Sequence, residues 1–250
     1  MEPLASKYRH VLLADFIGQA HLVGANSIIR KFIENKNLPS LIFWGPPGTG
    51  KTTLAFIISK GIKADFYKLS AVMSGKADLK RIMVKAIKNF NENKKTILFL
   101  DEIHRWNKSQ QDALLPYVEK GIVTLIGATT ENPSFSLIPA LLSRSRVFTF
   151  KKHKVEDLIK YVKYLVSSYN QEFKKSLELD RDALEFIAKA SDGDLRVGAN
   201  ILESFILSLK DGEKITKEFL HKAVENFLQY ESRGEDHYNI ISAVHKSLRD

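Results

Sequence analysis

The sequence predicts an α/β fold, a five-stranded parallel sheet between helices, followed by a small domain built of helices. Three observations predict this fold. Five short apolar segments typical of strands alternate with segments of helical periodicity up to residue 150. The first of these strands runs directly into a glycine-rich loop, and after residue 150 the strand pattern stops while the helical pattern continues.

The order of the elements follows from their periodicity and from the residues that interrupt it. Strands are predicted at 41–44, 65–70, 96–100, 123–128 and 147–150. The helices of this first part are predicted at 21–35, 51–61, 78–91, 109–120 and 137–142. The later helices are predicted at 155–169, 180–190, 195–209 and 216–229, the second and last of them capped by Asp180 and Thr216. A parallel sheet of this kind binds its ligand at the carboxyl ends of the strands.

Composition narrows the class of protein. The chain has 250 residues and no cysteine, which excludes a disulfide framework and a thiolate zinc site. Its net charge of +9 favours a polyanionic partner such as nucleic acid, although solvated lysine-rich faces explain individual lysines equally well. Neither a secretory signal nor a run of eighteen apolar residues occurs, so we expect a soluble, cytoplasmic protein with no membrane partner.

The glycine-rich loop matches the phosphate-binding pattern G-x-x-x-x-G-K-[ST]. Its glycines let the backbone turn tightly, so that the N–H groups at the start of the following helix point at an anion. Lys51 adds a positive charge for the β and γ phosphates, and the Thr52 hydroxyl can ligate Mg²⁺. The alternative, a turn that happens to precede a lysine, does not explain the strand before it and the helix after it. The predicted nucleotide-binding residues are Gly45, Pro46, Pro47, Gly48, Thr49, Gly50, Lys51 and Thr52.

Two carboxylates end the third predicted strand, 50 residues after Lys51. Adjacent parallel strands end at the same edge of a sheet, so Asp101 can reach the Mg²⁺ held by Thr52. Glu102 can then polarise a water molecule for attack on the γ-phosphate. Acidic residues often end strands for no catalytic reason, but the phosphate loop favours hydrolysis.

Three further positions carry polar groups that could complete such a site. Thr129, with Thr130 as the alternative, follows the fourth predicted strand and can bind the attacking water or the γ-phosphate. Arg144 and Arg146 precede the last strand, which we expect far along the sheet from the loop. Either arginine could act as an arginine finger from a neighbouring subunit. The alternative for both is a surface salt bridge. Arg196 opens a helix of the second domain and could reach the γ-phosphate.

With these residues in view, the chain resembles an AAA+ P-loop ATPase with a helical lid domain. GPPGTGKT resembles the Walker A motif of that family, LFLDE its Walker B motif and GDLR its sensor 2. The Ser-Arg-Ser run at 143–145 resembles a motif of the clamp-loader clade. The stretches 101–148 and 237–250 are very similar to the replication-associated recombination protein A family, also called the maintenance of genome stability protein A or Werner-helicase-interacting ATPase family.

This resemblance implies a DNA-dependent ATPase of replication-fork maintenance, repair and recombination, which uses ATP and Mg²⁺. It also implies forked DNA or single-stranded ends and single-strand-binding protein as partners, a location at the nucleoid, and tetramers formed through a C-terminal domain. The matching positions assign phosphate and Mg²⁺ binding to Lys51 and Thr52, metal binding to Asp101, the attacking water to Glu102, the finger in trans to Arg144, sensor 1 to Thr129 and sensor 2 to Arg196.

The loss of the strand pattern after residue 150 predicts an ATP-binding α/β domain at 1–150 and a helical lid at 151–230, and residues 231–250 are predicted to begin a further helical domain. Three departures stand out: His10 replaces a proline near the adenine side, Trp106 replaces a common phenylalanine, and the sequence ends at Asp250 before the family's oligomerising domain. The last departure leaves self-association of this chain open. Two other functions compete with this hypothesis, a clamp-loader ATPase subunit and a scaffold whose assembly depends on nucleotide.

Overall fold

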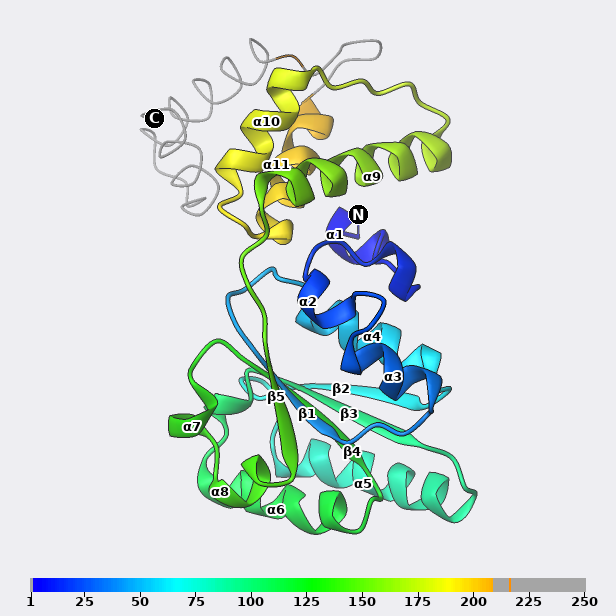
Figure 1. The fold of residues 1–250 in the computed structure, drawn as a ribbon, viewed down its shortest axis with the longest axis vertical. Helices are drawn as coiled ribbons and strands as arrows, with labels where there is room; N and C mark the ends of the chain where they lie inside the picture. Colours follow the sequence, from blue (N-terminus) through cyan, green and yellow to red (C-terminus); the bar gives the residue numbers. More distant parts are fainter. Residues whose placement is uncertain (1, 209–215, 217–250) are drawn as a thin grey trace. The chain divides into compact units, whose positions relative to one another are not determined.

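The computed structural model describes residues 2–208 and residue 216 (Figure 1). The contacts divide the chain into two units: His10–Lys151 forms the first, and the second combines the N-terminal residues through Arg9 with those from Lys152 onward. The predicted helix that begins at Thr216 and the predicted domain at 231–250 lie outside the described residues, apart from Thr216 itself.

The first unit contains the predicted parallel sheet. Its strands are β1 (Ser40–Trp44), β2 (Asp65–Ser70), β3 (Thr96–Asp101), β4 (Thr124–Thr129) and β5 (Ser145–Thr149). They pair in the order β2-β3-β4-β1-β5, with every pairing parallel. The five-stranded parallel sheet is therefore confirmed.

Helices connect these strands and cover both faces of the sheet. They are α2 (Ala20–Val23), α3 (Ile28–Glu34), α4 (Lys51–Gly61), α5 (Lys76–Asn91), α6 (Lys108–Glu119), α7 (Pro133–Ser136) and α8 (Pro139–Leu142), with short 3-10 turns η1 (Leu13–Asp15) and η2 (Ile103–Arg105). The single helix predicted at 21–35 is instead two helices. Ser27 interrupts it, because its hydroxyl accepts a hydrogen bond from Arg30 N and so starts α3 as a new helix.

Strand alternation directs successive side chains to two separate cores. Leu41 and Phe43 of β1 face the layer formed by α2, α3 and α4, whereas Ile42 faces α5, α6 and α8 on the other side (Figure 1). The three inner strands are almost fully buried, while the edge strands β2 and β5 keep several exposed residues. The sequence signal of a buried strand is strongest for β1, β3 and β4 because helices cover these strands on both faces.

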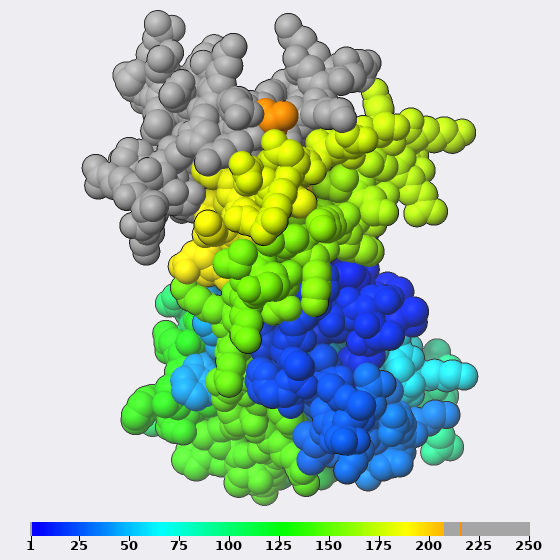
Figure 2. Space-filling model, turned by 45° about the horizontal axis from the view of Figure 1, so that its top comes forward, coloured from blue at the N-terminus to red at the C-terminus, as the bar shows by residue number. Residues whose placement is uncertain are grey.

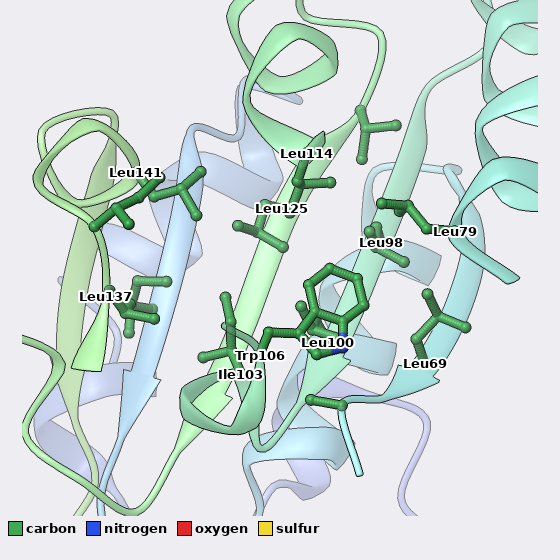
Figure 3. Packing of buried hydrophobic residues seen from close by; sticks show 14 of the residues in the cluster. Leu69, Leu79, Leu98, Leu100, Ile103, Trp106, Leu114, Leu125, Leu137 and Leu141 are labelled. Carbon is green, nitrogen blue, oxygen red and sulfur yellow. The ribbon is translucent and has the colours of Figure 1, made fainter. Parts of the chain in front are cut away.

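Trp106 belongs to the hydrophobic core that also contains buried residues of α5 and α6. Figure 3 shows its indole ring beside Leu100 and Ile103, and the residue is almost completely buried. Its Nε1 lies 3.4 Å from the carbonyl oxygen of Ser74 and donates to it. The aromatic residue at this position therefore fixes the turn that follows β3 to the core.

The second unit consists of α1 (Leu4–Lys7), α9 (Val155–Phe173), α10 (Arg181–Ala190) and α11 (Leu195–Ser208) within the described part of the chain. The Asp180 side chain accepts a hydrogen bond from Ala183 N at 2.6 Å, so its predicted role as the cap of α10 is confirmed. No helix among residues 2–208 is long and apolar enough to cross a membrane.

The N-terminal segment packs within the second unit. Leu4 is buried, and the Tyr8 hydroxyl donates a hydrogen bond of 2.7 Å to Glu172 of α9. Lys7 also bonds to Glu172, and these two hydrogen bonds, that of Lys7 first, hold the pKa of the carboxyl below its ordinary value. The sequence predicts one domain over residues 1–150, whereas the contacts group the first nine residues with the helices of the second unit.

Candidate functional site

The glycine-rich loop leaves β1 at the carboxyl edge of the sheet, where both neighbouring strands hold it. Gly45 N donates to Thr129 O of β4 at 3.1 Å, and on the other side Phe150 N donates to Trp44 O at 2.6 Å. The carboxyl end of β1 is therefore fixed at the point where the loop begins. Such a fixed starting point is what a backbone needs to present several N–H groups in one direction.

Two loop positions require glycine for steric reasons. Gly45 has φ +151°, and a Cβ atom there would lie 2.4 Å from the carbonyl oxygen of Phe150. Gly50 has φ +93°, and its Cβ would lie 2.8 Å from Cζ of Phe16. Any side chain at these two positions would push the loop out of shape.

The cationic and hydroxyl groups of the loop lie where the sequence predicted them, at the start of α4. Lys51 is buried, and its Nζ donates to the carbonyl oxygens of Gly45 and Pro46 at 2.7 and 2.6 Å. Thr49 Oγ1 donates to Pro46 O at 2.9 Å, and Thr52 is buried in the first turn of the helix. Pro47 and Gly48 complete the turn. A phosphate bound in the loop would replace the two carbonyl groups as the partner of Lys51.

The two carboxylates lie at the same edge of the sheet, but not on a strand adjacent to β1. The expected adjacency is wrong, because β4 lies between β1 and β3. Asp101 is the last residue of β3, with Lys68 Nζ at 3.9 Å from its Oδ2. Glu102 follows in the left-handed conformation with φ +54°, a strained geometry that turns its side chain away from the line of the strand.

The oxygen groups at this edge fit a magnesium ion. The Thr52 hydroxyl and the Asp101 carboxylate are hard oxygen donors, and Mg²⁺ in nucleotide sites takes one or two such protein ligands with phosphate oxygens and waters. The donor set therefore suits Mg²⁺ bound together with a nucleotide.

Thr129 is fully buried at the end of β4, whereas Thr130 is exposed. The Thr129 hydroxyl lies 2.9 Å from Nδ1 of His104 and accepts a hydrogen bond of 3.0 Å from Glu131 N. His104 also lies at this edge, although it is not among the site residues that the sequence predicts. No motif or periodicity singles it out, since its place beside Thr129 depends on the pairing of β3 with β4.

Arg144 lies just before β5, whereas Arg146 lies inside that strand, contrary to the prediction that both precede it. The expectation that this strand is far along the sheet from the loop is also wrong, because β5 pairs directly with β1. Arg144 nevertheless lies just before the opposite end of the strand, about 17 Å from the carboxyl edge for five steps of parallel strand at about 3.3 Å each. Its Nη2 pairs with Glu119 Oε1 of α6 at 2.7 Å, and the Arg146 guanidinium lies over the Phe32 ring.

Arg196 belongs to the second unit, where it is exposed in the first turn of α11. Asp194 caps this helix, since its carboxylate accepts from Arg196 N at 2.7 Å and from Val197 N at 3.3 Å. A reach from Arg196 to the nucleotide stays a prediction.

The segment before α2 joins the end of β5 beside the loop. The Gln19 side chain donates to Lys151 O at 2.6 Å and accepts from Lys151 N at 3.0 Å. Figure 2 shows the blue surface of the early residues next to green residues that come more than a hundred positions later. His10 also belongs to this segment; burial lowers its pKa, and the Asp15 carboxylate opposes that shift.

Comparison with known proteins gives the family. The ATPase family associated with various cellular activities (AAA) matches residues 41–153, and an AAA C-terminal domain matches residues 173–249. The chain belongs to the AAA+ ATPases. It is a homologue of replication-associated recombination protein A from Haemophilus influenzae, with 42% identity over 99% of this chain and 56% of that protein.

Two further relatives support the same assignment. The protein is 42% identical to ATPase WRNIP1 of Dictyostelium discoideum over 99% of this chain and 30% of that protein. The RuvB Holliday junction branch migration motor of Thermotoga maritima has a similar structure, with TM-score 0.72, 26% identity, and coverage of 92% of this chain and 76% of the other. The chain spans a little over half the length of the recombination protein A relatives that it matches.

Replacing Gly45 by alanine tests the loop geometry. The added methyl group meets backbone atoms of Phe150, so we expect the Kd for ATP to rise at least about tenfold. Gly75→Ala is the matched control, because a Cβ there meets nothing within 4 Å and its φ is −109°. Titration with a fluorescent ATP analogue measures both; equal affinity of the two variants would contradict the steric argument.

Proposed function

We propose that this protein hydrolyses ATP at the carboxyl edge of its sheet and completes the site with a residue from a second copy. One observation carries the proposal: the loop around Lys51, the carboxylates of Asp101 and Glu102, and the buried Thr129 meet at one edge of the sheet, through the strand order β3-β4-β1. Phosphoryl transfer to water requires groups of these kinds: a loop that binds phosphate, a pair of carboxylates and a hydroxyl group.

In the proposed reaction, loop N–H groups and Lys51 bind the β and γ phosphates. Glu102 orients a water molecule and takes its proton as the water oxygen bonds to the γ-phosphorus. The bond from phosphorus to the β,γ-bridging oxygen breaks, and ADP and inorganic phosphate are released. The Thr129 hydroxyl lies on the adjacent strand end, where it can bind the γ-phosphate or the water.

When bound, Mg²⁺ neutralises phosphate charge as the leaving oxygen becomes negative. The protein's part is to hold the ion through the Thr52 hydroxyl and the Asp101 carboxylate. We further propose that Arg196 contributes from the lid, residues 151–230, which would let the helical unit respond to the γ-phosphate.

Arg144 is proposed to act in trans because its position separates it from its own phosphate loop by the length of β5. Its ion pair with Glu119 lies at the surface, with both side chains about two-fifths exposed, at 42% and 41%. Exposed pairs of this kind contribute about 0–1 kcal/mol, so exchange of Glu119 for a phosphate of a neighbouring subunit costs little. Arg146 stacks on Phe32 and has less freedom to make such an exchange.

Two substitutions separate binding from hydrolysis. Lys51→Ala removes charge-assisted hydrogen bonds, so we expect at least about tenfold weaker ATP binding. Glu102→Gln keeps the size of the side chain but removes the base, so ATP binding persists while turnover falls by about 10² or more. Phosphate-release and nucleotide-binding assays distinguish the two effects, and full turnover in both variants would refute the mechanism.

A mixing experiment tests the shared site. Arg144→Ala should lower turnover by about 10³ with ATP affinity unchanged, whereas Arg146→Ala serves as the matched control. Mixing Arg144→Ala with Lys51→Ala protein places an intact loop beside an intact Arg144 at about a quarter of random interfaces. Turnover should then recover to about that fraction; a mixture as slow as its components would contradict action in trans.

We propose that the ATPase acts on DNA in replication-associated recombination and repair. The names of its homologues and the net charge of +9 support this role, and forked DNA, single-strand-binding protein and a homo-oligomer at the nucleoid are the proposed partners and setting. Forked DNA should increase the ATPase rate more than duplex DNA of equal length, and higher salt should reduce the increase. Turnover per chain should also rise with protein concentration; a rate that responds to neither DNA nor concentration would refute this role.

A further inference from the structure

His104 connects the proposed base to the end of the neighbouring strand. Its Nε2 lies 3.3 Å from Oε2 of Glu102, and its Nδ1 lies 2.9 Å from the hydroxyl of Thr129. The same hydroxyl accepts a hydrogen bond from Glu131 N at 3.0 Å and donates one to Glu131 O at 3.2 Å. A continuous series of polar contacts therefore joins Glu102 to β4.

The imidazole ring is held in place by the turn that carries it. Its side chain is 3% exposed, although it lies between carboxylates at the edge of the site. Ile103 of η2 and Trp106, the residue that follows η2, both insert into the hydrophobic core (Figure 3), and Arg105 N donates to Glu102 O at 2.8 Å. Because core packing fixes this turn, His104 cannot follow Glu102 if that side chain moves away.

The hydrogen-bonding capacity of the partners determines where His104 carries hydrogen. Nε2 faces Glu102 and, at 3.6 Å, the carboxylate of Glu131, and ionised carboxylates can only accept. Nε2 therefore carries a hydrogen, and in that tautomer of the neutral ring Nδ1 is an acceptor, which shares the single hydrogen of the Thr129 hydroxyl with Glu131 O. A new acceptor at that hydroxyl, such as a γ-phosphate oxygen, would compete with both His104 and Glu131 O for this hydrogen.

We propose that His104 is a positioning residue for hydrolysis, which holds the Glu102 carboxylate in a fixed position relative to the Thr129 hydroxyl. The proposal rests on the proposed roles of Glu102 and Thr129. Glu131 offers a second, more exposed carboxylate to the same nitrogen, with a side chain 58% exposed against 35% for Glu102. His104 Nε2 thus has two alternative acceptors, the carboxylates of Glu102 and Glu131. A new acceptor that takes the Thr129 hydrogen weakens the bond at Nδ1, and this change alters how firmly Nε2 holds Glu102.

Two conservative variants test the two contacts of the His104 ring separately. The amide nitrogen of glutamine reaches about as far as Nε2, so His104→Gln keeps a donor for Glu102; asparagine reaches about as far as Nδ1, so His104→Asn keeps only the contact with Thr129. We expect His104→Ala and His104→Asn to lower kcat about 10-fold to 100-fold, with KM for ATP within about twofold of wild type. His104→Gln should recover kcat to within about threefold of wild type.

Arg105→Ala, an exposed change on the same turn, is the control and should keep wild-type kcat and KM. Nucleotide affinity measured with a fluorescent ATP analogue shows that each variant retains a folded site. In the Glu102→Gln background, single-turnover rates should not fall further on adding His104→Ala, because the group it positions is already lost. An independent structural role would instead give a further loss.

The outcomes distinguish the positioning role of His104 from the proposed role of Glu102 as the base. Full turnover by Glu102→Gln would overturn the proposed role of the base itself. Slow Glu102→Gln together with normal kcat in His104→Ala would overturn the positioning role alone. Equal losses in the glutamine, asparagine and alanine variants, or a loss of ATP affinity in step with kcat, would also overturn it, since they indicate a purely structural histidine.

Discussion

The site depends on the pairing of β1 between β4 and β5. Hydrogen bonds from both neighbours fix the end of β1, through Gly45 N to Thr129 O and Phe150 N to Trp44 O. The phosphate loop then starts from a rigid point, and the same pairing brings Thr129 to the loop and, one strand further, Asp101 and Glu102. Because parallel strands share one carboxyl edge, a single sheet register positions groups that are some eighty residues apart.

The groups at this edge differ in how firmly they are held, and the difference matches the chemistry proposed for each. Lys51 is buried among carbonyl oxygens of its own loop, and Thr129 and His104 are enclosed by the strand ends and the core. Arg144 instead lies at the surface in an exposed ion pair. Rigid groups suit the binding of phosphate and water, while a residue that serves another subunit has to be able to change partners.

Most of the fold could be predicted from the chain, because buried parallel strands and capped helices leave strong local patterns. The helix from Lys51 to Gly61 and the strand from Asp65 to Ser70 have the predicted bounds, and Asp180 is the predicted cap. Errors arose where a single side chain altered a local pattern or where an edge strand is partly exposed. Ser27 divides one predicted helix into two, and the half-exposed edge strand β5 begins before Arg146, where its apolar signal is weak.

The sequence by itself determined the composition of the phosphate loop, the acidic pair after the third strand and the order of the elements, since these are local features of the chain. Tertiary structure decided the strand order, with β4 between β1 and β3 and β5 beside β1. It also decided that His104 meets Thr129 and Glu102, and that Arg144 lies at the far end of its strand from the loop. Strand pairing joins residues distant in sequence, and no local periodicity records which strands become neighbours.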